Sequence, residues 1–138
     1  MRITLDTNIL VSGTFWTGAS FRILDLVDRK KLRSISSKEI IEEYYGVINS
    51  DEIIDKIERK KLIIYKLVEK IIKNSEITEP RTKLSIVKED PDDNKILECA
   101  KEGRVDYIIT QDEHLLKLKK FENIPILKPD DFLKLLRN

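Results

Sequence analysis

The feature that most restricts the fold of this chain is a set of short apolar runs separated by longer segments with helical periodicity. The β-compatible runs cover residues 1–5, 33–36, 105–110 and 124–127. Between them, apolar side chains recur three or four residues apart, which is typical of helices with one buried face. Short apolar strands that alternate with helices predict an α/β protein whose sheet is largely parallel.

The intervening segments predict the helices. We expect helices over residues 19–31, 51–57, 60–73, 91–102 and 129–136, and two more that begin after Ser37 and at Asp112. Residues 8–12 are expected to form a helical turn, and residues 13–18 a loop that carries Phe15 and Trp16. Residues 75–87 are less regular and have room for a strand or two. Gly103 is a typical helix stop.

Length and composition limit the class of protein. The 138 residues fit one domain, over residues 1–138, with a sizeable core. The 26 basic and 25 acidic side chains nearly cancel, so nucleic acid would have to bind at local patches. The single cysteine, Cys99, excludes an internal disulfide and a cysteine zinc site, and we expect it to be buried. The sequence shows no signal peptide and no membrane-spanning apolar run, so we expect a cytoplasmic protein without a membrane partner.

Acidic residues stand at several points that this fold would bring together. Asp6 directly follows the first strand, and Asp112 comes just after the strand over residues 105–110. If these strands are parallel neighbours, both carboxylates lie at one edge of the sheet, where such folds bind ligands. Asp93, at the start of the preceding helix, can reach the same edge. Glu42 or Glu43, on the helix after Ser37, can supply a fourth acid.

Each acid also has a structural interpretation. Asp90 can cap a helix that has Pro91 at its first position and Asp93 at its third. Asp112 can be an ordinary N-cap, and either glutamate can be a solvated helix residue. Asp6 is harder to explain in this way, because an acid that ends a buried strand is costly without a compensating partner.

Carboxylates that lie close together repel one another unless they are protonated or bind a cation. Two of them about 4 Å apart repel by roughly 4 kcal/mol at an effective dielectric constant near 20. They therefore take up protons or bind an ion, and oxygen donors favour Mg²⁺ or Mn²⁺. Such ions orient a phosphodiester and activate water, which predicts a metal-dependent phosphodiester hydrolase. The one histidine, His114, is expected on the surface of a helix and not in the site.

Four motifs, in this order and spacing, resemble those of the PIN-domain nucleases. They read LDTNIL, SKEIIEEYYGVI, DPDDNKILECA and DYIITQDEHLL, and the resemblance runs from Arg2 to about Leu136. It is strongest to the toxin-like PIN proteins of bacterial and archaeal toxin–antitoxin pairs. The resemblance implies a three-layer α/β/α fold with a central, mainly parallel sheet. It also implies an endoribonuclease that uses Mg²⁺ or Mn²⁺.

The resemblance also implies roles for individual residues. Asp6, Glu43, Asp93 and Asp112 are the expected catalytic and metal-binding acids, with Asn8 and Thr110 as supporting residues. The EYYGVI pattern selects Glu43 over Glu42, although the helix pattern itself leaves this choice open. Asp93 stands seven residues before Ala100, and Asp112 ends a T-x-D pattern.

The expected partners follow from the same likeness. They are an RNA substrate, a small antitoxin protein and a second copy of the chain in a homodimer. Basic clusters at residues 28–33, 58–61 and 117–120 can meet phosphates. Phe15 and Trp16 can stack on a base or seat a partner, although a place in the core or in a dimer contact is favoured. Two alternatives stay open: a nuclease that processes RNA or DNA outside a toxin pair, and a non-catalytic binding module whose acids are caps.

Overall fold

The computed structural model describes residues 1–15, 18–50, 59–88 and 93–137. Six strands in this part of the chain form one sheet in the order β3-β2-β1-β4-β6-β5. They are β1 (Arg2–Leu5), β2 (Arg33–Ser37), β3 (Glu76–Thr78), β4 (Tyr107–Ile109), β5 (Lys120–Phe121) and β6 (Ile124–Leu127). All pairings are parallel except that of β5 with β6, which confirms the mainly parallel sheet.

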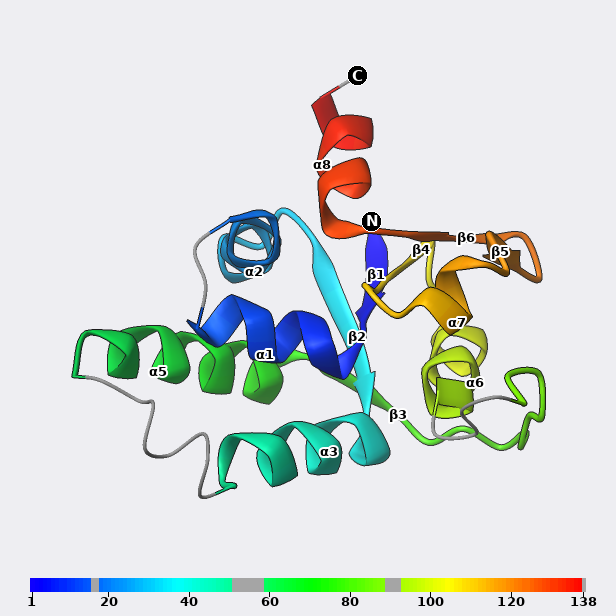
Figure 1. The fold of residues 1–138 in the computed structure, drawn as a ribbon, viewed down its shortest axis with the longest axis horizontal. Coiled ribbons are helices and arrows are strands. Elements are labelled where there is room, and N and C mark those ends of the chain that lie inside the picture. Colours follow the sequence, from blue (N-terminus) through cyan, green and yellow to red (C-terminus); the bar gives the residue numbers. More distant parts are fainter. Residues whose placement is uncertain (16–17, 51–58, 89–92, 138) are drawn as a thin grey trace.

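Helices cover both faces of this sheet. In Figure 1, α1 (Thr7–Phe15), α2 (Ala19–Asp28) and α5 (Arg59–Asn74) lie to the left of the strands. Helices α6 (Asn94–Gly103) and α7 (Glu113–Leu116) lie to the right. Helix α3 (Lys38–Ile48) contacts both α1 and α6, and α8 (Pro129–Arg137) packs against α2. This is the expected three-layer α/β/α arrangement.

The core is built from β-branched and leucine side chains of the strands and of the inner helix faces. Ile3, Ile35 and Ile108, from three neighbouring strands, are fully buried. Cys99 of α6 is also buried, as predicted, and its burial raises the pKa of the thiol. No helix in the described part of the chain combines the length and apolarity needed to cross a bilayer.

The predicted loop over residues 13–18 is wrong at its start, because α1 continues through Phe15. The misleading residue is Gly13. A Cβ built at this position would come 2.1 Å from Leu24 Cδ1, so the glycine allows α1 and α2 to pack closely and does not end the helix. The helix predicted over residues 51–57 and the side chain of Trp16 lie outside the described residues.

The helix predicted over residues 91–102 is observed as α6, from Asn94 to Gly103. The expected cap and first turn at Asp90 and Pro91 lie outside the described residues. At the other end, Gly103 is still helical, and Arg104 takes the left-handed conformation with φ 49°. Gly103 is needed for packing, because a Cβ there would lie 2.5 Å from Ile35 Cγ2.

Candidate active site at the carboxyl edge of the sheet

The pairing of β1 with β4 brings Asp6 and Thr110 side by side. The two strands are parallel neighbours with Leu5 opposite Ile109, so the next residue of each strand lies at the same edge. The Asp6 backbone N–H donates to the Ile109 carbonyl at 2.9 Å. The Thr110 hydroxyl donates to Asp6 Oδ2 at 2.6 Å. Asp6 and Thr110, 104 positions apart in the sequence, thus meet at the predicted edge of the sheet.

Asp6 is a buried carboxyl group, only 5% exposed. Besides Thr110, its oxygens accept hydrogen bonds from the Thr7 backbone N–H at 2.7 Å and from Asn8 Nδ2 at 3.2 Å. Burial is the main reason why the pKa of Asp6 rises from 3.8 to about 6, with smaller contributions from the charges of Glu43 and Asp112. The hydrogen bonds from Thr110 and Thr7 oppose this rise in pKa.

Thr110 and Asn8 support the second strand end as well as the first. The Asp112 backbone N–H donates to the Thr110 hydroxyl at 2.9 Å, so this one hydroxyl joins Asp6 to the loop that carries Asp112. The Gln111 backbone N–H donates to Asn8 Oδ1 at 3.4 Å. Asp112 is the N-cap of α7, and its Oδ1 accepts from the His114 backbone N–H at 2.7 Å.

Asp93 lies at the N-cap position of α6 and is 9% exposed. Its backbone is helical, with φ −69° and ψ −19°, and its side chain makes no capping hydrogen bond. Asp93 therefore does not act as the side-chain N-cap of α6, and the predicted arrangement with Asp90 as the cap lies outside the described residues. A capping residue needs an extended backbone to turn its carboxylate onto the helix amides, whereas the carboxylate of Asp93 lines the pocket described below.

The structure distinguishes the two glutamates of α3. Glu43 lines the same pocket as Asp6, whereas Glu42 lines the adjacent groove and lies 3.7 Å from Lys38 Nζ. Glu43 Oε2 forms an ion pair with the ammonium of Lys95, a side chain of α6 that is 17% exposed. Sequence reasoning missed Lys95, because nothing in the pattern separates it from the other 25 basic residues.

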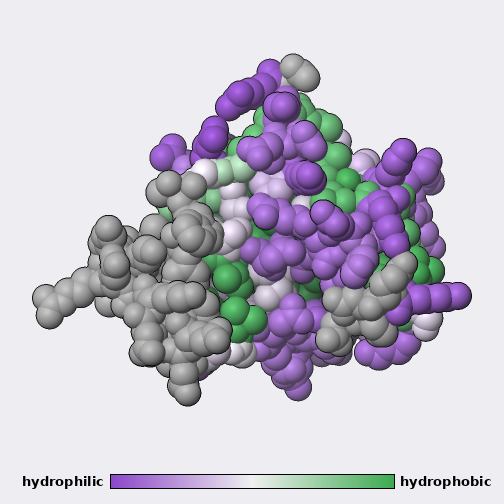
Figure 2. Space-filling view, viewed as in Figure 1, coloured by the Kyte–Doolittle hydropathy of each residue, from purple (hydrophilic) through white to green (hydrophobic). Residues whose placement is uncertain are grey.

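These acids share one pocket of about 490 Å³. It is lined by Asp6, Thr7, Asn8, Val11, Ser12, Glu43, Val47, Asp93, Gln111 and Asp112. In Figure 2, hydrophilic residues gather at the centre of the face, over the region where α1, α3, α6 and α7 meet in Figure 1. The pocket therefore joins all four predicted acids and Asn8, with Thr110 buried beneath Asp6.

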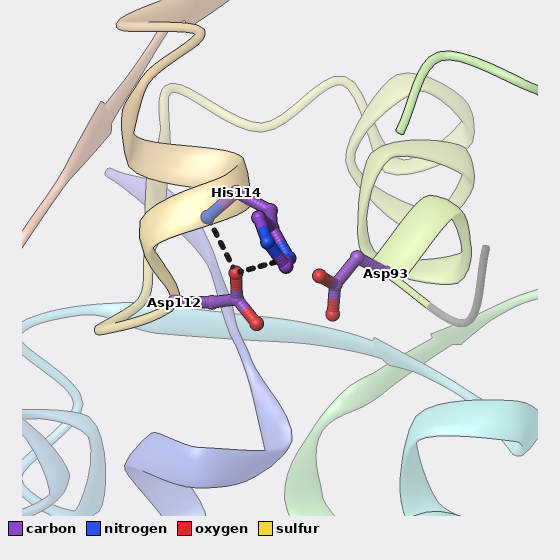
Figure 3. A group of neighbouring side chains, drawn as sticks. All are labelled: Asp93, Asp112 and His114. Atoms are coloured by element: carbon purple, nitrogen blue, oxygen red, sulfur yellow. Dashed lines mark hydrogen bonds and ion pairs between the residues drawn. The ribbon is translucent and has the colours of Figure 1, made fainter. Parts of the chain in front are cut away.

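Three donor atoms of this region lie close enough together to share a cation. They come from Asp93, Asp112 and His114, and all lie within 4.8 Å of one another. Figure 3 shows the imidazole turned toward both carboxylates. His114 was expected on the surface, but its side chain is 43% exposed and faces the site. Because Asp112 is the N-cap of α7, His114 lies in the first turn of this helix, next to the cap.

The donor set fits a divalent cation. Acidic residues from four chain segments line one pocket. Burial is the main cause of the raised pKa of Asp6, and the nearby charges of Glu43 and Asp112 raise it further. Mg²⁺ and Mn²⁺ prefer such oxygen donors, and an imidazole is a further ligand for Mn²⁺. Asp6, Asp93, Asp112 and Glu43 are the acids of this pocket that could hold it.

The chain is similar to one protein family and to proteins of known structure. The PIN-domain family model matches residues 2–114. A chain of VapBC2 from Rickettsia felis, solved bound to a DNA fragment from their promoter, is 20% identical with a TM-score of 0.59, over 93% of this chain and 98% of that chain. PAE2754 from Pyrobaculum aerophilum is 14% identical with a TM-score of 0.60, over 99% of this chain and 98% of that chain.

At these identities the two solved structures show a shared fold. Comparison with curated protein sequences gives no match. The family match covers most of the chain and includes Asp6, Glu43, Asp93 and Asp112, so the chain belongs to the PIN-domain family of nucleases.

Proposed function

We propose that this protein is a metal-dependent endoribonuclease that hydrolyses RNA phosphodiester bonds, and that it is the toxin of a type II toxin–antitoxin pair. One observation carries the catalytic part of this proposal. Asp6, Glu43, Asp93 and Asp112 come from four separate segments and line one pocket at the carboxyl edge of the sheet. Four acids in one pocket are unfavourable for stability alone, which supports a role in binding a cation.

In this proposal Mg²⁺ or Mn²⁺ is held by Asp6, Asp93 and Asp112, with Glu43 beside them. Such an ion supplies Lewis acidity, which activates water and stabilises the negative charge on the phosphate and leaving oxygens. The chain itself fixes the acids in advance. Thr110 and Asn8 hold the Asp6 carboxylate, and the His114 backbone N–H orients Asp112. Carboxylates held in this way need little rearrangement when the ion binds.

The RNA strand has to approach an acidic pocket by way of local positive charge. The end of α7 leads into Lys117, Lys119 and Lys120, all exposed. Lysines that follow the short helix capped by Asp112 can hold the phosphates on either side of the one to be cleaved, while the ion offsets the repulsion between that phosphate and the acids. Binding of this kind should weaken strongly as salt is added.

The toxin assignment rests on a likeness of fold. VapBC2 from Rickettsia felis, which shares this fold, was solved with DNA from the promoter, and its name designates a pair of proteins. We propose by analogy that a small antitoxin covers the acidic pocket of this chain and that the chain pairs as a homodimer. A small open reading frame next to the gene, whose product reverses growth arrest by this protein, would support the pair. A nuclease that processes RNA or DNA outside a toxin pair would not cause a growth arrest that a neighbouring gene product reverses.

The enzymatic proposal is tested with Asp6→Asn and Asp93→Asn. Both variants remove one acid while keeping the size of the side chain, and we expect each to lose RNA cleavage in Mn²⁺ or Mg²⁺ by at least about a hundredfold. Asp130→Asn, an exposed acid of α8, is the matched control and should cleave normally. A chelator should abolish cleavage by the wild type. Undiminished cleavage by folded Asp6→Asn would refute the proposal, and failure of all proteins to bind Mn²⁺ would favour a binding module.

A further inference from the structure

The cation site of this chain contains a nitrogen donor in addition to its acids. His114 is the only histidine of the 138 residues, and its imidazole lies with Asp93 and Asp112 in the group of donors within 4.8 Å of one another. The two carboxylates come from different elements, α6 and the cap of α7, and the ring is turned toward both in Figure 3. A cation between these carboxylates would therefore have the imidazole within reach.

The position of the ring is not explained by helix capping. The capping bond to Asp112 Oδ1 comes from the His114 backbone N–H at 2.7 Å, and any residue other than proline can supply it. The ring nitrogen Nδ1 lies 3.8 Å from the same oxygen, which is too long for a hydrogen bond. Atoms that share an ion at about 2.1 Å lie about 3 to 4 Å apart, so this separation suits a common cation.

An imidazole changes which ion such a site prefers. Mg²⁺ is a hard ion that takes oxygen ligands and keeps several waters, whereas nitrogen ligands suit first-row transition metals. A site made of carboxylates alone discriminates little between Mg²⁺ and Mn²⁺ through its donor atoms. One nitrogen among them favours Mn²⁺, and ions later in the first-row series, over Mg²⁺.

We propose that His114 is a direct ligand of the cation, together with Asp93 and Asp112, and that it gives this site a preference for Mn²⁺ over Mg²⁺. The inference rests on the proposed function, since it concerns the same cation site. It goes further by assigning a ligand and a metal preference to a residue outside the four acids. His114 holds the ion and the backbone of His114 holds Asp112, so one residue supports the site in two ways.

The test uses tag-free protein, so that His114 supplies the only imidazole. Mn²⁺ is bound to the wild type, and electron spin-echo spectra are recorded for nitrogen coupling to the ion. Mn²⁺ and Mg²⁺ are then titrated separately by calorimetry into wild type, His114→Phe and His114→Asp. Glu113→Gln, at the exposed neighbouring position in α7, is the control for a change in this turn.

We expect imidazole nitrogen coupling in the wild type and in Glu113→Gln, and none in either His114 variant. His114→Phe should lose roughly tenfold or more in Mn²⁺ affinity, and less in Mg²⁺ affinity. His114→Asp replaces nitrogen with oxygen and should lower the ratio of Mn²⁺ to Mg²⁺ affinity even if both affinities rise. The wild-type spectrum is decisive even if a variant fails to fold.

Suppose that the wild type binds Mn²⁺ without nitrogen coupling, that Asp93→Asn loses this binding, and that His114→Phe keeps the wild-type affinities. These results would overturn this inference and leave the proposed function standing. Equal losses of Mn²⁺ and Mg²⁺ affinity in His114→Phe would overturn the preference. Absence of any Mn²⁺ binding by the wild type would overturn both the inference and the metal-dependent function.

Discussion

Lys95 of α6 and Glu43 of α3 form an ion pair at the rim of the acidic pocket, so the helix that carries Asp93 also holds the acid contributed by α3. The pair offsets one of the four negative charges of the pocket. Lys95 is mostly buried and Glu43 is 37% exposed, so solvent screens this attraction only in part.

Lys95→Met should therefore change metal binding and catalysis in opposite directions. Without the ammonium, the Glu43 charge adds to the field on the cation, and we expect Mn²⁺ to bind roughly tenfold more tightly, or about 1.4 kcal/mol. RNA cleavage should slow, because Glu43 is no longer held in place. Calorimetry and cleavage assays measure the two effects.

Lys95→Arg keeps both the charge and the pair and should behave like the wild type. Lys88→Met removes an exposed lysine of the adjacent groove and controls for the change in net charge. Equal Mn²⁺ affinity in folded Lys95→Met and wild type would mean that the pair only joins the two helices.

The raised pKa of Asp6 makes the stability of the metal-free protein depend on pH. Asp6 binds its proton more tightly in the folded protein, with a pKa of about 6 against 3.8. Its contribution to stability is greatest below pH 4 and is lost as the pH rises through 6, by about 3 kcal/mol at about 1.4 kcal/mol per pKa unit. Urea unfolding in a chelator, from pH 4 to 7, measures this loss.

Asp6→Asn has no carboxyl group to titrate and should lack this part of the pH dependence. Added Mn²⁺ replaces the proton and should flatten the curve of the wild type as well. Identical pH dependence in wild type and Asp6→Asn would contradict a raised pKa at this position.

The Thr110 hydroxyl is the next target, because it is buried and joins the two strand ends. Thr110→Val keeps the shape and removes the hydrogen bond to Asp6, so we expect a loss of roughly 1.5 to 3 kcal/mol in the free energy of unfolding. The pKa of Asp6 should rise further, since this bond favours the charged form. An NMR titration of the carboxyl carbon follows the pKa.

Thr110→Ser retains the hydroxyl and should keep both the pKa and most of the cleavage activity. A Thr110→Val protein with the pKa and activity of the wild type would show that the hydroxyl does not support Asp6.

Two helical glycines, Gly103 and Gly46, should respond in opposite ways when alanine replaces them, and the free energy of unfolding measures the difference. Gly103→Ala places a Cβ 2.5 Å from Ile35 Cγ2, which should cost about 1 to 3 kcal/mol because α6 has to move away from β2. Gly46→Ala, in α3, meets no atom within 4 Å and should stabilise the protein by about 0.5 to 1 kcal/mol. Thermal unfolding distinguishes the two, and a stabilised Gly103→Ala variant would contradict the packing described here.

The sequence predicted the sheet and the convergence of the acids because both follow from strands that are short and apolar. Asp6 directly follows β1 and Asp112 comes shortly after β4, so the parallel pairing of these strands places both acids at the same edge of the sheet. The prediction of Ser37 as a helix cap also depended only on nearby residues. It is confirmed, because Ser37 Oγ accepts from the Ile40 backbone N–H at 3.4 Å.

What the sequence did not predict depends on contacts between distant segments. Gly13 is typical of a loop in the sequence, whereas in the structure it lies in a helix and provides room for Leu24 of the next helix. Lys95 and His114 have no distinguishing pattern, because their roles arise from Glu43 and Asp93, which lie on other elements. The sequence did not predict β5, because this strand has only two residues and is recognised only by its pairing with β6.

The hydrogen bond between Thr110 and Asp6 also has a consequence for biosynthesis. It closes a loop of 104 residues, so the pocket cannot assemble before β4 has left the ribosome and found β1. Such non-local pairing is a slow step in folding. Under the proposed function, the chain would therefore be unable to cut RNA until most of it has been translated.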